Sequence, residues 1–301
     1  MKLRLPAAVL SLALLLRLCP GAAAPRCATW WLEPYSNLTS VSAYVDAWSG
    51  LAAAGRGRCY VAAGSAYALK HNGSLGYADT PAGEGNDGVL MERYGFPALR
   101  QLNITAITAL VYVTHNDGIT AMLAEPQPFI DALLAVAERE QLAGFDLDYE
   151  PQGAPSRAEA AAFMAFLSSL AAQMAARGLA RLTIDIGGCP TFYSFDCAGA
   201  LANVSAANTM DAFNVRGVAD MQALVRTDGA QLGARWAPGF EPASVGEAQF
   251  SAIMAWLATP AACAQQGACP RSIASWAARE YNTGPQPAWL WQAVNTFLDA
   301  P

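Results

Sequence analysis

Three acidic residues alternate with three large apolar residues in the segment 144–150, which reads Gly-Phe-Asp-Leu-Asp-Tyr-Glu. Successive side chains of an extended strand point to opposite faces, so Asp146, Asp148 and Glu150 project to one side of the chain. Carboxylates crowded on one face repel one another when ionised, so we expect them to share at least one proton. A carboxyl group kept protonated in this way can protonate a leaving oxygen. The segment therefore predicts acid catalysis by carboxyl groups.

Two other interpretations of the three acids stay open. They could form the solvent-exposed face of a half-buried strand, which would carry no chemistry. That interpretation is disfavoured if the strand is internal and parallel, because both faces of such a strand are covered. The acids could also bind a divalent cation through their oxygens. Further ligands would then come from nearby strand ends, where the chain has Asn116, Asp117 and Asn214.

The elements that must hold these acids alternate along the chain between short β-type runs and longer helical runs. Strands are predicted at 28–32, 59–63, 106–113, 144–150, 182–186, 212–215, 232–237 and 272–277. The clearest helices are predicted at 127–140, 156–177, 221–225, 246–258 and 287–298. Eight strand–helix units with apolar strands favour an α/β fold of the (βα)8 TIM barrel type. Glu150 then ends the fourth strand, at the carboxyl end where barrel active sites lie.

The rival architecture is an open, doubly wound sheet, but its usual nucleotide-binding motifs are absent. No Gly-x-Gly-x-x-Gly follows the first strand and the sequence contains no Walker loop. Within the predicted barrel, Ser156 and Glu159 form a capping box at one helix start, and Gly178 ends that helix. The segment 69–93, rich in Gly, Asp and Asn, is predicted to be an elaborated loop at the rim.

The first residues have the pattern of a secretory signal peptide. Two basic residues precede an apolar run at 7–16, and small residues follow at 21–24. We expect cleavage after Ala23, which leaves residues 24–301 as the barrel domain. A membrane anchor is the alternative, but the run is shorter than the ~20 residues that span a bilayer. The prediction is a secreted or lumenal protein.

The cysteines and glycosylation sequons fit that compartment. Cys19 leaves with the signal peptide, and six cysteines remain as an even set suited to disulfides. Proximity in the sequence predicts Cys189–Cys197 and Cys263–Cys269, which leaves Cys27 to pair with Cys59; fifteen pairings are possible. N-glycosylation sequons occur at Asn37, Asn72, Asn103 and Asn203.

Composition excludes one large class of partner. The chain has 18 Lys and Arg against 24 Asp and Glu, a net charge of −6, and no cluster of basic residues. Such a chain repels polyanions, so we expect no nucleic-acid partner. No stretch after the signal peptide reaches membrane-spanning length without a charge, glycine or proline, so we expect no membrane partner either. We expect a monomer.

The segment 144–150 resembles the fourth-strand signature of glycoside hydrolase family 18, the chitinases and endo-N-acetylglucosaminidases, usually written DxxDxDxE. The last three acids match, whereas the first position of the signature is Ala143 here. The family fold is an eight-stranded βα barrel. The resemblance implies retaining hydrolysis of a β-1,4 bond next to an N-acetylglucosamine, in which the acetamide of the sugar is the nucleophile.

The resemblance also implies a role for each acid. Glu150 would be the general acid and then the base, Asp148 would orient the acetamide and stabilise the oxazolinium ion, and Asp146 would hold Asp148 and share its proton. Neither a metal nor a cofactor is implied. Trp276 resembles the tryptophan that forms the floor of the family's sugar site.

One departure from the family lies on the predicted sixth strand. A tyrosine usually binds the acetamide oxygen there, whereas this chain reads Asp-Ala-Phe-Asn-Val-Arg over 211–216. By strand parity we expect Asn214 to face the lumen and donate an amide hydrogen instead. Chitooligosaccharide and the N-glycan core are the expected substrates. The alternative is a catalytically silent barrel that acts as a secreted glycan-binding protein, favoured by Ala143 and the missing tyrosine, whereas Glu150 favours the enzyme.

Overall fold

The computed structural model describes residues 25–32, 38, 40–78, 87–102, 104–188, 197–260, 270–276 and 287–300 of the 301-residue chain. The predicted signal peptide lies outside the described residues. So do Cys189, Cys263, Cys269 and the sequon residues Asn37 and Asn103.

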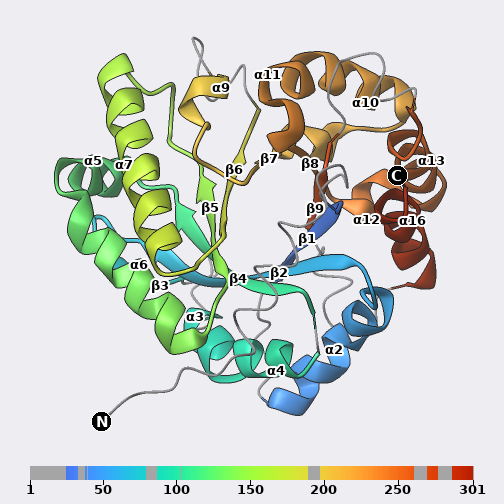
Figure 1. The fold of residues 1–301 in the computed structure, drawn as a ribbon, viewed down its shortest axis with the longest axis horizontal. Helices are drawn as coiled ribbons and strands as arrows, with labels where there is room; N and C mark the ends of the chain where they lie inside the picture. Colours follow the sequence, from blue (N-terminus) through green and yellow to red (C-terminus); the bar gives the residue numbers. More distant parts are fainter. Residues whose placement is uncertain are drawn as a thin grey trace.

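Parallel strands form a closed barrel at the centre of the molecule (Figure 1). They are β1 (Cys27–Leu32), β2 (Cys59–Leu69), β4 (Ala106–Val113), β5 (Gly144–Tyr149), β6 (Arg181–Ile186), β7 (Ala206–Thr209), β8 (Trp236–Phe240) and β9 (Ser272–Trp276). Each strand pairs with its neighbour in chain order, and β1 closes the ring by pairing with both β2 and β9. The prediction of a (βα)8 TIM barrel is confirmed. β5, which carries the acids, is the fourth barrel strand.

Helices surround the barrel on its outer face (Figure 1). The longer ones are α2 (Val41–Ala54), α4 (Phe96–Gln101), α5 (Asn116–Ala124), α6 (Pro126–Glu140), α7 (Arg157–Ala176), α10 (Val218–Leu224), α13 (Glu247–Leu257) and α16 (Ala288–Leu298). Short ones are α3 (Asp87–Leu90), η1 (Met91–Gly95), α9 (Cys197–Ala200), η2 (Met210–Asn214), η3 (Val225–Gly229), α11 (Ala230–Leu232), η4 (Gly233–Arg235) and α12 (Pro242–Val245). They bury the apolar outer face of the strands.

α7 shows how local signals set these helices. The Ser156 hydroxyl accepts a hydrogen bond from the backbone N–H of Glu159 at 3.2 Å, and the Glu159 carboxylate accepts one from the Ser156 N–H at 2.8 Å. The predicted capping box is therefore confirmed, and Gly178 follows the helix with a φ of +75°. α7 is long and apolar enough to cross a membrane by length and composition. In the structure it covers the barrel, with Phe163 and Phe166 among its buried side chains.

Two strand predictions were wrong in position. The sixth barrel strand lies at Ala206–Thr209 rather than 212–215, and residues 210–214 form a 3-10 helix. The seventh lies at Trp236–Phe240 rather than 232–237. β7 is short and carries the polar pair Asn208 and Thr209, so it lacks the apolar run that marks the other strands. Within the segment 69–93, predicted to be a loop, β3 (Leu75–Tyr77) forms a hairpin with β2.

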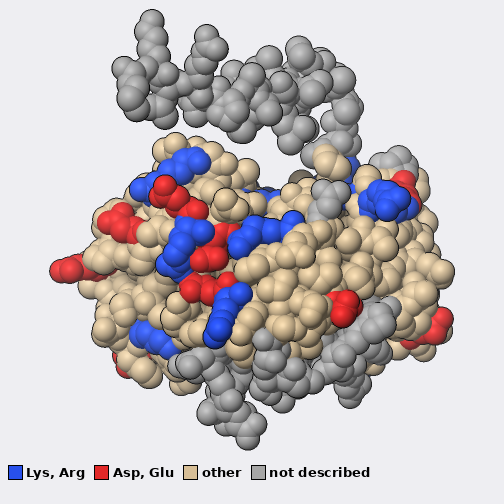
Figure 2. Space-filling model, turned by 90° about the horizontal axis from the view of Figure 1, so that it is seen from below, with Lys and Arg blue, Asp and Glu red and all other residues tan. Residues whose placement is uncertain are grey.

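Charged side chains of both signs lie next to one another on the face shown in Figure 2. Among the described residues, Arg139 binds Glu140 at 2.9 Å, and Arg100 of α4 lies 3.9 Å from the Glu140 carboxylate. Glu92 of η1 pairs with Arg139 and accepts a hydrogen bond from the Tyr77 hydroxyl at 2.6 Å. These contacts fasten the β2–β3 hairpin and α4 to α6.

The amino ends of β1 and β2 are joined covalently. Cys27 and Cys59 are directly opposite in the strand register and form a disulfide with Cα atoms 4.6 Å apart, as predicted. Arg181 at the start of β6 donates hydrogen bonds to both sulfurs, at 3.4 and 3.2 Å, so this pair and the guanidinium lie at the same end of the barrel. Cys197 is also disulfide-bonded.

The buried residues form two groups. The larger one lies between strands and helices and contains the outward-facing side chains, with Trp30 and Trp236 among them. The smaller one consists of Trp31, Ala63, Leu110 and Ala274, each from a different barrel strand, with Tyr112, Phe213 and Trp276 packed against it. This second group lies inside the barrel, because its members alternate with the outward-facing residues along their strands. The inside of the barrel is thus part apolar and part carboxylate.

Candidate active site

β5 begins at a glycine that lets the neighbouring strand approach closely. Gly144 has a φ of +155°, and a Cβ atom there would lie 1.7 Å from the carbonyl oxygen of Arg181. Only glycine fits this position without moving β6. From there β5 pairs with β4 on one side and β6 on the other, and alternate residues point into the barrel. The outward-facing residues Phe145 and Leu147 are completely buried among the helices.

Asp146 is the deepest of the three predicted acids and is fully buried. Its carboxylate accepts hydrogen bonds from the Trp31 indole at 2.7 Å, from the Thr183 hydroxyl, and from the Asn208 amide at 3.3 Å. Burial raises the pKa of Asp146, and the hydrogen bonds from Thr183 and Trp31 oppose that rise because they stabilise the ionised form. The site therefore contains a buried carboxylate surrounded by donors from three other strands.

Asp148 lies one inward-facing position further along β5 and is 8% exposed. Its Oδ1 atom is buried and has no hydrogen-bond partner among the described residues. Burial, followed by repulsion from Glu150 and Asp146, raises the pKa of Asp148 well above its usual value. Such an unpartnered oxygen costs stability in the free protein.

Glu150 follows the last residue of β5 and is exposed. The strand ends one residue earlier than predicted, but the Glu150 N–H still donates a hydrogen bond to the Val113 carbonyl at 3.2 Å, which holds its backbone beside β4. The three acids thus run from a closed interior to the solvent. Their positions follow from strand parity and from the end of β5.

Sequence reasoning missed a fourth carboxyl group, Asp185 on β6. It is 3% exposed and lies directly opposite Asp148 in the strand register. The Asn208 amide of β7 donates a hydrogen bond to it at 2.6 Å. Burial, then repulsion from Asp146 and Asp148, raises the pKa of Asp185 well above its usual value. The signal was present, because Thr183 and Asp185 alternate with apolar residues exactly as the acids of β5 do.

Trp276 ends β9, is half-buried and lies at the carboxyl end of the barrel interior. Its ring centroid lies 5.9 Å from that of Trp31, and the Phe213 ring packs edge-on against Trp31 at 6.0 Å. These three rings form an aromatic wall that contacts the carboxylates through the hydrogen bond from Trp31 to Asp146. Such rings can stack on the apolar face of a sugar.

The expected strand position of Asn214 was wrong. Asn214 ends the 3-10 helix η2 and is exposed, so strand parity gives no reason to place its side chain in the barrel. Phe213, the preceding residue, packs against the interior group instead. Asp211 of the same helix is half-buried. Its carboxylate packs against Gly188, where a Cβ atom would lie only 2.0 Å from Asp211 Oδ2. Burial raises the pKa of Asp211.

The residues suggested as extra ligands for a cation do not converge on the acids. Asn116 exchanges two hydrogen bonds with the backbone of Gln152, each of 2.8 Å, and Asp117 pairs with His71 at 2.7 Å. Asn214 is exposed on η2. Within the described ranges, no group of three or more His, Cys, Asp or Glu side chains could hold a metal ion.

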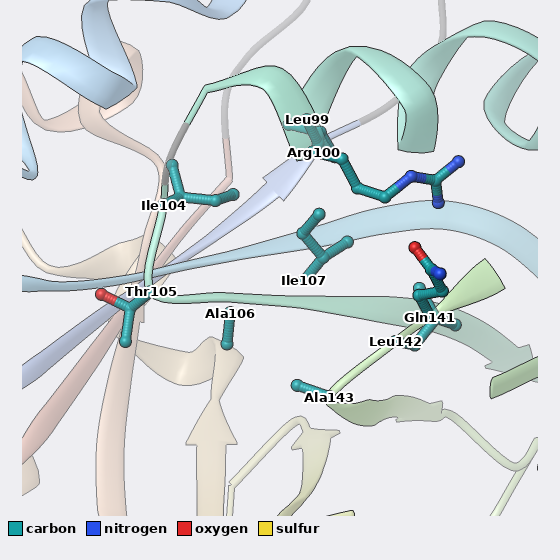
Figure 3. Close-up of a pocket in the computed structure, with 9 residues that line it drawn as sticks. All are labelled: Leu99, Arg100, Ile104, Thr105, Ala106, Ile107, Gln141, Leu142 and Ala143. Atoms are coloured by element: carbon teal, nitrogen blue, oxygen red, sulfur yellow. The ribbon is translucent and has the colours of Figure 1, made fainter. Parts of the chain in front are cut away.

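Ala143, the position of the missing first acid, lies at the other end of β5 from Glu150. It lines a pocket of about 340 Å³ at the amino ends of β4 and β5, together with residues such as Leu99, Ile107 and Gln141 (Figure 3). The pocket does not contain any of the carboxylates described above. The departure from the family signature thus lies three residues below Asp146, away from the open end of the barrel.

Solved enzymes share this fold. A class V chitinase from Pseudomonas fluorescens Pf-5 is similar with a TM-score of 0.59 and 16% identity, over 91% of this chain and 100% of that one. A family 18 chitinase from the fern Peteris ryukyuensis has a TM-score of 0.56 and 12% identity, over 91% and 99%. An endo-β-N-acetylglucosaminidase from Cordyceps militaris has a TM-score of 0.52 and 14% identity, over 98% and 97%.

No protein-family model and no curated protein matches the sequence. Identities of 12–16% establish a common fold and nothing finer. The fold expected from the resemblance of 144–150 to the family signature is therefore confirmed: the chain has the barrel fold of the chitinases and endo-β-N-acetylglucosaminidases of glycoside hydrolase family 18.

Proposed function

We propose that this chain is a retaining glycoside hydrolase that cleaves β-1,4 bonds next to N-acetylglucosamine, with the acetamide of the substrate as nucleophile. The observation that carries the proposal is the graded row of acids on β5. Asp146 is enclosed by donors, Asp148 has a buried oxygen without a partner, and Glu150 is exposed at the carboxyl end. A row built for stability alone would not leave a buried carboxylate oxygen unpaired.

Each acid then has a step in the reaction. Glu150 protonates the glycosidic oxygen while the acetamide oxygen attacks the anomeric carbon, which breaks the glycosidic bond and forms an oxazolinium ion. The unpartnered oxygen of Asp148 accepts the acetamide N–H, and its negative charge stabilises the ion. The Glu150 carboxylate next takes a proton from water, which attacks the anomeric carbon and restores the acetamide. No metal or cofactor takes part in this scheme.

The fold supports a substrate that contains N-acetylglucosamine, either chitooligosaccharide or the chitobiose core of an N-glycan. The solved structures of similar fold include chitinases and an endo-β-N-acetylglucosaminidase. The half-buried Trp276 ring supplies a stacking surface for one sugar, and the buried Trp31 ring supports it, with ring centroids 5.9 Å apart. Asn214 is not part of this proposal.

The decisive experiment compares wild type with Glu150→Gln on both substrates. We expect wild type to release sugar and Glu150→Gln to be slower by about 10²- to 10⁴-fold, the usual contribution of a general acid. Glu138→Gln is the matched control, because it removes the same charge from an exposed position on α6. Equal rates for wild type and Glu150→Gln would contradict the mechanism. Glycan binding by the wild type without turnover would favour the catalytically silent alternative.

We further propose that the chain is secreted or lumenal and acts as a monomer. The amino-terminal sequence, the Cys27–Cys59 disulfide and the disulfide at Cys197 support an oxidising compartment. Asn72 and Asn203 are exposed, as sequon residues of a glycoprotein must be.

A further inference from the structure

The donors around Asp146 outnumber those around its neighbours. Asp146 accepts from Trp31, Thr183 and Asn208. The Asn208 amide donates to Asp146 at 3.3 Å and also to Asp185 at 2.6 Å, so it brings the two carboxyl groups together. Two buried carboxyl groups held on one amide repel each other when both are ionised, so one of them carries a proton. Because Asp146 already accepts from three donors, the proton belongs on Asp185.

Asp185 is itself placed to remain neutral. One of its oxygens accepts from the Asn208 amide at 2.6 Å, and its carboxyl group stands opposite Asp148 across the β5–β6 ladder. The charged or titratable groups that face it are Asp146 and Asp148 on β5, and both would repel its ionised form. The basic residue of its own strand, Arg181, lies at the amino end and contacts the disulfide. No cation from these strands offsets a second negative charge beside Asp146.

We propose that Asp185 is a positioning residue that remains protonated and donates to Asp146, so that Asp146 stays ionised and ready to take the proton of Asp148. When the acetamide arrives, the proton on Asp148 passes to Asp146. Asp148 becomes the carboxylate that the oxazolinium ion requires, and Asp146 becomes neutral, so the charge of the interior is unchanged. The proton returns when the acetamide leaves. Asp185 on β6 thus adds a further acid to the row on β5, where the first acid of the family signature is replaced by Ala143.

The proposal on Asp185 deepens the proposed function and rests on it for its catalytic part, but its protonation state can be measured without turnover. An infrared difference spectrum between wild type and Asp185→Asn at pH 6 should show a protonated carboxyl band that is present in the wild type and absent from the variant. Asp46→Asn, at an exposed position of α2, should show loss of a carboxylate band instead. A carboxylate band lost in Asp185→Asn would overturn the proposal. A protonated band in a protein without glycosidase activity would leave the proposal standing and overturn only the proposed function.

The catalytic part is tested by two replacements of Asp185 and one of its neighbour. Asparagine can accept from Asn208 and donate to Asp146 as a protonated carboxyl does, whereas leucine can do neither. We expect Asp185→Leu to lower kcat by roughly 10- to 100-fold, the value of a hydrogen bond to a charged group. Asp185→Asn should lower kcat less. It should also move the alkaline limb of the kcat–pH profile to higher pH, because the amide donor of asparagine cannot ionise.

The same amide at Asp146 should be far more damaging than at Asp185. Asp146→Asn would bring an amide donor against the Trp31, Thr183 and Asn208 donors and remove the proton acceptor, so we expect a loss in kcat of more than about 100-fold. Equal losses for Asp146→Asn and Asp185→Asn, or an alkaline limb that does not move in Asp185→Asn, would contradict the proposal. Circular dichroism of each variant checks that the barrel has folded.

Discussion

Asp148 should reduce the stability of the protein that it serves, and replacing it by asparagine should show this. Asp148 is buried, has an oxygen without a partner and faces Asp146 and Glu150, so its folded-state pKa is raised. A carboxyl group with a raised pKa keeps its proton in the folded state at pH values where the unfolded chain has lost it. Stability contributed by such a group therefore falls as pH rises from its unfolded pKa to its folded pKa. Asp148→Asn removes this dependence.

The size of the effect follows from linkage. The unfolded pKa of an aspartate is about 3.9, and each pH unit between the two pKa values is worth up to about 1.4 kcal/mol. Between pH 4.5 and 5.5 the free energy of unfolding of Asp148→Asn should thus gain up to about 1.4 kcal/mol relative to wild type. In a domain of this size that corresponds to roughly 2 to 3 °C in melting temperature.

The assay is thermal unfolding of wild type, Asp148→Asn and Asp46→Asn across pH 4 to 7. Asp46 is exposed on α2, so its variant should follow the wild type at every pH. Glycosidase activity measured on the same samples should be lost in Asp148→Asn alone. A melting temperature of Asp148→Asn that stays parallel to wild type, or falls relative to it as pH rises, would refute the reasoning.

Two further predictions concern the frame of the site and its compartment. Gly144→Ala should destabilise the protein by about 3 kcal/mol or more, because its Cβ would lie 1.7 Å from a backbone oxygen of β6. Gly178→Ala, at a φ of +75° with open space around it, should cost only about 1 kcal/mol, and equal losses in denaturant unfolding would show that the close approach is unimportant. Asn72 is exposed in the β2–β3 turn, so in a eukaryotic secretory host we expect it to carry an N-glycan. The mass of the protein should fall on enzymatic deglycosylation, and the mass of Asn72→Gln should be lower than that of the wild type by one glycan. An unmodified peptide at Asn72 would count against the secretory route.

Much of the barrel could be predicted because its determinants are local. The strands predicted at 106–113 and 272–277 and the capping box of α7 follow from short stretches of sequence. The pairing of Cys27 with Cys59, 32 residues apart, was expected only because the nearer cysteines were assigned to each other. The sixth strand could not be found in this way. Its inward side chain is Asn208, so the strand shows no apolar run, and its four residues owe their extended form to pairing with β6 and β8.

The sequence by itself determined the row of Asp146, Asp148 and Glu150 and the side to which it points, because strand parity is a property of the backbone. It did not determine the partners of that row. Trp31 and Asn208 are separated from Asp146 by 115 and 62 residues, and they meet it only because the barrel closes and its strands take one register. Closure and register are set by packing over the whole chain, so the tertiary structure alone decided that Asp185 stands beside the row and that Asn214 does not.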